Sequence, residues 1–177
     1  MKRFCSQFTF CSPKKILRQA VVEQNSSGVI TDLFLLNDRS SESTHTLFVD
    51  GIVSSKIVSL QQQLSPQELH FVQNKYQYIN LSFGISLNEM IPNNKKLILD
   101  FGTNSTDEIN KTLHTSFPFL VRFSIFDILS ACVYYPLLES QQRAELKFGT
   151  KTNLLQWKNI DLANKKITEK TKINYLH

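Results

Sequence analysis

The sequence lacks any apolar run close to the roughly 20 residues that a membrane-spanning helix needs, so we expect no such helix. It has only 5 glycines and 1 tryptophan against 13 phenylalanines, which favours a packed core and excludes a low-complexity polymer. The first 15 residues have no continuous apolar segment, so they do not predict a signal peptide. With 41% hydrophobic and 20% charged residues, we expect a soluble, cytoplasmic globular protein of one domain, or one domain with a small appendage.

Cysteine and histidine are scarce and scattered. Cys5, Cys11 and Cys132 are odd in number and lack the spacing of a zinc site, so we expect reduced thiols in the core or at the surface. Cys132 is interpreted as a buried thiol on a helix, with a Cys–His pair with His114 as the alternative. We expect no cofactor and no metal, because phosphate-loop, nucleophile-elbow and zinc-cluster motifs are missing. The histidines are assigned to core or surface positions: His45, His70, His114 and His177.

The net charge is +5, and the basic excess lies at the two ends of the chain. Near the C-terminus, the basic residues include Lys165, Lys166, Lys170 and Lys172. The favoured interpretation is a solvated sheet face with lysines at edge strands. The alternative is a surface that binds nucleic acid.

Strand patterns dominate both ends of the chain. Period-two alternation predicts strands over residues 3–10, 16–24 and 29–37, joined by turns at 12–15 and 25–28. Residues 46–49 and 52–58 are predicted as two short strands around a turn at Gly51, which completes an antiparallel meander. Strands return at residues 153–157 and 170–176.

Helical patterns occupy the middle. Ser65 is a plausible N-cap for one helix, and a second is predicted from Thr106 to about Ser116, with Pro118 interrupting it. A third runs from Ile125 to Tyr135 with Ser124 as its N-cap. A short buried strand at residues 97–101 precedes the second helix. The order predicts an α+β fold.

Three segments, in order, resemble one family. Phe4–Asp32 combines an aromatic-rich strand, a turn and a "G-x-I" motif, and Phe48–Ser65 has an aromatic residue and a Gly before two apolar stretches. In Phe117–Leu176, the run Phe148 to Leu155 is similar to a closing "FG-S-x-x-x-G-K-x-P-G" motif. The chain resembles metal-dependent amidohydrolases of the cytosine-deaminase, chlorohydrolase and aminodeoxyfutalosine-deaminase type.

The resemblance implies that the metal ligands have been replaced. Gln61 and Gln63 stand where the family has the histidines of H-x-H, and Asn104 stands where a "G-T-D-S" turn carries an aspartate. Amides are weak, neutral donors and cannot take a proton from a metal-bound water. We match no position to the later histidine ligands or to the acid–base glutamate. The alternative is a chance alignment in which the glutamines merely cap a strand.

Length argues against a complete barrel. Only residues 59–143 lie between the strand-rich ends, whereas an eight-unit barrel typically needs roughly 250 residues. We therefore expect a small antiparallel β-sandwich built from residues 1–58 and 144–177. Residues 59–143 would form a truncated α/β barrel remnant with two to three helices.

These observations predict a non-catalytic amidohydrolase-like protein, a pseudoenzyme that acts as a binding, scaffold or regulatory subunit. Its expected partner is another protein or a second copy, bound through exposed surface of the remnant. We expect no membrane partner. The alternatives are a residual amidohydrolase or deaminase-type hydrolase, and a weak nucleic-acid binder that uses its basic termini.

Overall fold

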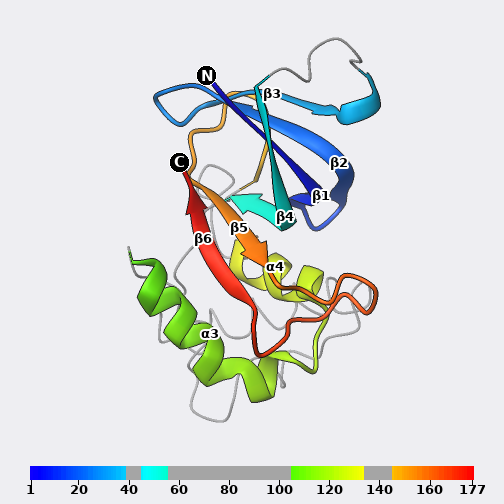
Figure 1. The fold of residues 1–177 in the computed structure, drawn as a ribbon, viewed down its shortest axis with the longest axis vertical. Coiled ribbons are helices and arrows are strands. Elements are labelled where there is room, and N and C mark those ends of the chain that lie inside the picture. Colours follow the sequence, from blue (N-terminus) through cyan, green and yellow to red (C-terminus); the bar gives the residue numbers. More distant parts are fainter. Residues whose placement is uncertain (39–44, 56–104, 134–144) are drawn as a thin grey trace, which may run out of the picture.

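Strands from both ends of the chain share one sheet in the computed structural model, which describes residues 1–38, 45–55, 105–133 and 145–177. The sheet has six strands in the order β3-β2-β1-β4-β5-β6 (Figure 1). Two short helices accompany it, so the described fold is predominantly β with a small helical part. The strands are β1 (Lys2–Ser12), β2 (Lys15–Gln24), β3 (Ile30–Leu35), β4 (Thr46–Ser55), β5 (Leu154–Lys158) and β6 (Lys172–Leu176).

The N-terminal strands β1, β2 and β3 form the expected antiparallel meander. The turn between β2 and β3 is the predicted one. The side-chain oxygen of Asn25 accepts hydrogen bonds from the amides of Ser27, at 3.0 Å, and Val29, at 2.9 Å. Gly28 has a φ of 80°, a conformation that glycine adopts without steric cost. A 3-10 turn, η1 (Leu36–Asp38), follows β3.

Strand β4 corrects two expectations. It is one continuous strand, not two short strands around a turn at Gly51, and it pairs parallel to β1. The sheet is therefore mixed and not wholly antiparallel. Val49 pairs with Ser6 and Ile52 pairs with Phe8, so two residues of β4 lie opposite Gln7 alone. A glycine with positive φ suits such a β-bulge as well as a turn, and the sequence pattern did not separate the two.

Gly51 makes this bulge possible. Its φ is 87°, and its amide donates a hydrogen bond of 3.3 Å to the side-chain oxygen of Gln7. A Cβ atom at Gly51 would collide with the backbone carbonyl of Trp157 on β5. Beyond the bulge, β4 pairs antiparallel with β5, with Ile52 opposite Trp157 and Ser55 opposite Leu154.

The apolar core also joins the two chain ends. Trp157 of β5 is fully buried, and its indole N–H donates to the Ser54 hydroxyl at 3.0 Å. The segment before β5 lies along the β2–β3 turn, where the side-chain amide of Gln24 donates to the carbonyl of Thr152 at 2.6 Å. One buried cluster consists of Phe4, Cys11, Val22, Ile30, Val53, Leu146 and Leu154.

The helix α3 (Thr106–Leu120) lies against β6. It extends past Ser116, so the expectation that Pro118 would interrupt it is wrong. A proline removes one N–H donor, but the chain beyond it still closes a turn, with the Val121 amide donating to the Phe117 carbonyl at 2.9 Å. The proline is accommodated in the last turn of the helix.

The helix α4 (Ile125–Val133) packs against β1 through Phe126, whose ring meets that of Phe8 edge-on at 5.6 Å. Its N-terminus has the predicted cap. The Ser124 hydroxyl accepts from the Asp127 amide, and the Asp127 carboxylate accepts from the Ser124 amide, both at 3.3 Å. Ser124 therefore caps this helix reciprocally. Tyr135, its expected last residue, lies outside the described residues.

None of the helices in the described part of the chain is long and apolar enough to cross a membrane.

Candidate functional site

The positions that the sequence assigns to replaced metal ligands lie outside the described residues. These are Gln61, Gln63 and Asn104. In the sequence, the two glutamines follow β4, which ends at Ser55, and Asn104 precedes α3, which begins at Thr106. The short strand at 97–101, the helix predicted after Ser65, and His70 also lie outside the described residues.

The C-terminal end of β4 is buried and polar. Ser54 and Ser55 are both 0% exposed. The Ser54 hydroxyl accepts from the Trp157 indole and donates to the Ser55 carbonyl at 3.1 Å. A buried polar atom without a hydrogen-bond partner costs free energy, and these two hydrogen bonds satisfy the Ser54 hydroxyl. The bond from the Trp157 indole holds this end of β4 against β5.

An open pocket of about 280 Å³ lies beside the first half of β4. It is lined by Cys5, Ser6, Gln7, Gln19, Leu36, Phe48, Val49 and Asp50. The lining combines apolar side chains with amides, a hydroxyl and one carboxylate, and no histidine is among it. Such a lining can hold a small apolar group and orient it with a few hydrogen bonds.

The cysteine thiols on β1 are poor nucleophiles. Cys5 and Cys11 are free thiols, as the sequence predicts, and of the two expected locations, core or surface, both occupy the core. Burial raises the pKa of Cys5, and it raises the pKa of Cys11 to about 11, against the opposing effect of the Lys15 charge. Since the thiolate is the reactive form, a raised pKa keeps these thiols inert near neutral pH. Cys5 therefore contributes shape, not reactivity, to the pocket.

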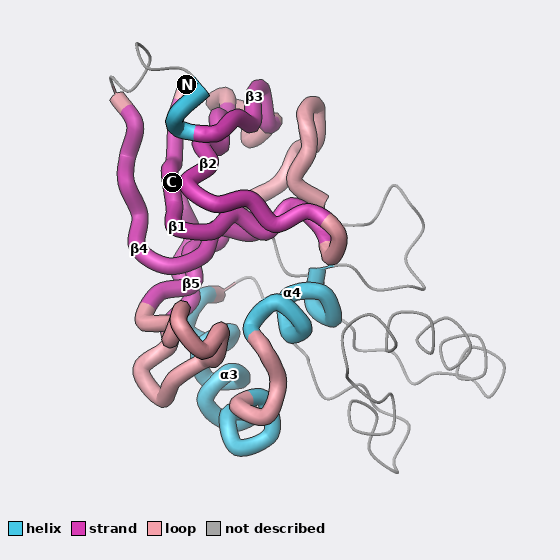
Figure 2. The backbone as a smooth tube through the Cα atoms, turned by 90° about the vertical axis from the view of Figure 1, so that its right-hand side faces the viewer, coloured by secondary structure: helices cyan, strands magenta, loops and turns pink. Residues whose placement is uncertain are grey.

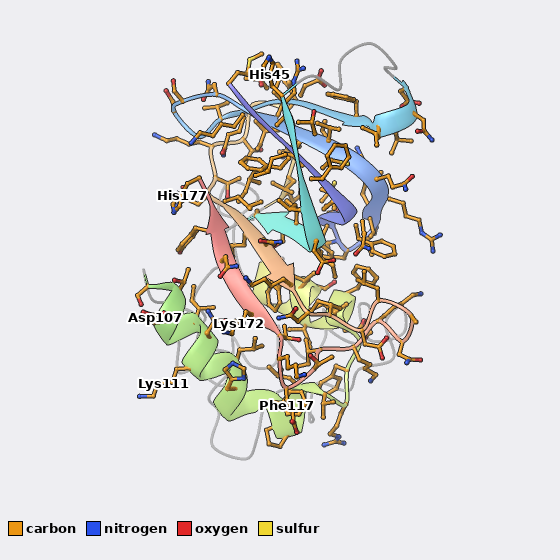
Figure 3. All side chains as sticks on the ribbon, viewed as in Figure 1. His45, Asp107, Lys111, Phe117, Lys172 and His177 are labelled. Atoms are coloured by element: carbon orange, nitrogen blue, oxygen red, sulfur yellow. The ribbon has the colours of Figure 1, made fainter. Side chains whose placement is uncertain are left out.

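The histidines whose side chains the structure describes are exposed and lie apart. His45 precedes β4 and His177 follows β6 (Figure 3), and His114 is on α3. Within the described ranges, no group of three or more His, Cys, Asp or Glu side chains could hold a metal ion. The side chain of Cys132 is not among those described, so the alternative Cys132–His114 pair stays a hypothesis.

The C-terminal lysines lie on a loop between β5 and β6 and on β6 itself. Lys165, Lys170 and Lys172 are exposed, and Lys172 lies at the start of the edge strand. Lys166 is half-buried, and its ammonium group donates to the Arg122 carbonyl at 2.7 Å. Lys172 fits the expected role of a lysine at a sheet edge.

The sequence does not predict two features of the structure, one on β4 and one on α3. Phe48, a residue of a predicted strand, is 63% exposed and lines the pocket. The other is Asn110 of α3, whose side-chain amide donates to the Ile173 carbonyl at 2.9 Å and accepts from the Ile173 amide at 2.8 Å. The sequence carries no signal for the exposure of Phe48, because adjacent apolar residues such as Leu47 and Phe48 are typical of a buried strand.

No protein-family model and no curated protein matches the chain.

Proposed function

We propose that this chain is a non-catalytic, amidohydrolase-like protein that acts as a binding, scaffold or regulatory subunit. The observation that supports it best is the antiparallel pairing of β4 with β5, over Ile52–Trp157 to Ser55–Leu154. These two strands belong to two of the segments that carry the resemblance, and β1, in the third, pairs with β4 on its other side. Segments far apart in the sequence thus meet as a composite sheet, in keeping with the proposed ancestry.

The proposal includes the finer architecture that the resemblance implies. The sheet would belong to a small β-sandwich of both chain ends, and residues 59–143 would be a truncated barrel remnant. Its strand β4 leads toward Gln61 and Gln63, where neutral amides replace imidazoles. Without imidazole or carboxylate ligands, a divalent ion that activates water has no strong donors here. What remains to such a scaffold is binding, to a protein partner or to a second copy.

Metal content tests the proposal. The full chain is purified without chelators, incubated with excess zinc or iron, dialysed and subjected to elemental analysis. We expect far less than one ion per chain, and we expect Gln61→Ala and Asn104→Ala to leave the metal content unchanged. The control is Asn153→Ala, which removes an exposed amide elsewhere. Stoichiometric metal that is lost in Gln61→Ala and Asn104→Ala, but kept in Asn153→Ala, would refute the proposal.

A further inference from the structure

Within the part of the chain that the structure describes, the first half of β4 is an open edge of the sheet. Residues 46–49 pair with β1 on one side, whereas β5 pairs only with residues 52–55 on the other. The side-chain amide of Gln156 donates to the Asp50 carbonyl at 2.8 Å and closes the β4–β5 ladder there. Among the strands that the structure describes, none pairs with Thr46–Val49 on the outer side, and Figure 2 shows this part of β4 at the margin of the molecule.

This open edge is apolar. Leu47 is 55% exposed and Phe48 is 63% exposed. Since successive side chains of a strand point to opposite faces, the two residues place apolar surface on both faces of the edge. Exposed strand edges with apolar side chains are templates for pairing with another chain. Another element is expected to cover such an edge, and the backbone N–H and C=O groups of the edge favour a strand as that element.

The sheet protects β6 differently. At that strand, the amide of Asn110 satisfies both the N–H and the C=O of Ile173, as a neighbouring strand would, and Lys172 adds a charge. Charged residues and covering elements are the ordinary means by which proteins block edge pairing. The corresponding part of β4 carries leucine and phenylalanine in place of a lysine. The contrast within one sheet favours a role for the β4 edge in association.

We propose that the edge Thr46–Val49 pairs antiparallel with the same segment of a second copy across a two-fold axis at Phe48. In this register Phe48 faces Phe48 of the second copy, Leu47 faces Val49, and Thr46 faces Asp50. Aromatic and apolar cross-strand pairs stabilise such a ladder, and Asp50, the charged residue that follows the segment, lies opposite Thr46 and not opposite a like charge. The segment is therefore complementary to itself, as a two-fold interface requires. The pairing joins two six-stranded sheets into one.

Mass in solution is the first test. Light scattering after size exclusion, from micromolar to near-millimolar concentration, is expected to give twice the 20.4 kDa of the chain. Phe48→Lys removes the central aromatic pair and places like charges together, so it weakens dimerisation by at least about tenfold. The matched control is Phe148→Lys, because Phe148 is also exposed, at 78%, but lies on the loop before β5. A wild-type monomer at every concentration, or a Phe48→Lys dimer as tight as the wild type, overturns the proposal.

A disulfide tests the register. Two residues directly opposite in an antiparallel pair have Cβ atoms about 5 Å apart, close to disulfide geometry. Under mild oxidation, Phe48→Cys is expected to form a covalent dimer. Thr46→Cys is the control, because its two copies would lie about 13 Å apart along the strands. Cross-linking of Phe48→Cys no stronger than that of Thr46→Cys contradicts the two-fold axis at Phe48. These outcomes do not depend on metal content, so this inference and the proposed function fail separately.

Discussion

Cys11 lies in the core that both chain ends build, and its environment shows how strongly that core excludes water. It is 1% exposed, and its burial outweighs the favourable charge of Lys15 in setting the thiol pKa. The Cys11 thiol donates a long hydrogen bond of 3.9 Å to the Thr9 carbonyl. The side chain behaves as a small apolar group, and this is its structural role.

The raised pKa of Cys11 makes the free energy of unfolding depend on pH in the alkaline range. Burial moves the pKa of Cys11 from 9.0 to about 11 in the folded protein. Its contribution is therefore fully present below pH 9 and is lost as the pH rises toward 11, because the unfolded thiol ionises first. We expect the free energy of unfolding to fall across this window by up to about 3 kcal/mol from this group. Urea denaturation at several pH values measures it.

Cys11→Ala serves as the control for this pH dependence. The substitution lowers stability at every pH because it leaves a small cavity, but the slope between pH 9 and 11 should become shallower. Other groups that titrate there contribute equally to both proteins. A wild-type slope equal to that of Cys11→Ala would show that the Cys11 thiol ionises as readily in the folded state as in the unfolded state.

At the scale of elements, β4 owes its shape to one glycine. Among the described strands, residues 46–49 before the bulge at Asp50–Gly51 pair with β1 alone, and residues 52–55 after it pair with both β1 and β5. A bulge shifts the strand locally and changes its twist. The open edge at Leu47–Phe48 and the covered end at Ser54–Ser55 therefore follow from the same local feature.

Replacement of Gly51 is expected to lower the stability of the protein strongly. Gly51→Ala combines a strained positive φ with a collision against the Trp157 carbonyl, and we expect it to cost more than about 3 kcal/mol of stability. Gly149→Ala is the matched control. Gly149 has a φ of 79° but no atom within 4 Å of the added Cβ, so only the strain of about 1 kcal/mol should remain. Equal losses in chemical denaturation would contradict the collision at β5.

Much of the local structure could be predicted from sequence, and the pairing of β4 could not. Asn25 to Gly28 specified a hairpin turn, and Ser124 specified a helix N-terminus, because their side chains act on backbone groups a few residues away. The parallel pairing of β4 with β1 depends on contacts between distant residues. Gly51 signalled an unusual φ but not whether the chain reversed. No local pattern indicates that Asn110 covers β6. The assignment of Gln61, Gln63 and Asn104 as replaced ligand positions stays a prediction.

At the scale of the whole molecule, the fold is a composite of chain ends. The cluster around Phe4 and Val22 is completed by Leu146 and Leu154 from the other end. The segment before β5 also closes onto the β2–β3 turn, where the Ile30 amide donates to the Thr150 carbonyl at 2.9 Å. The sheet should therefore gain and lose its structure as one cooperative unit.

Native-state hydrogen exchange tests this composite sheet most directly, and with it the main support for the proposed function. We expect the β4 amides that pair with β5 to exchange only through global opening, with the same free energy as the central amides of β1 and β2. The amides of β5 should share that value, because Trp157 and Leu154 are buried against both ends of the chain. Exchange of β5 at a clearly lower free energy, with β1 and β2 still protected, would contradict the account.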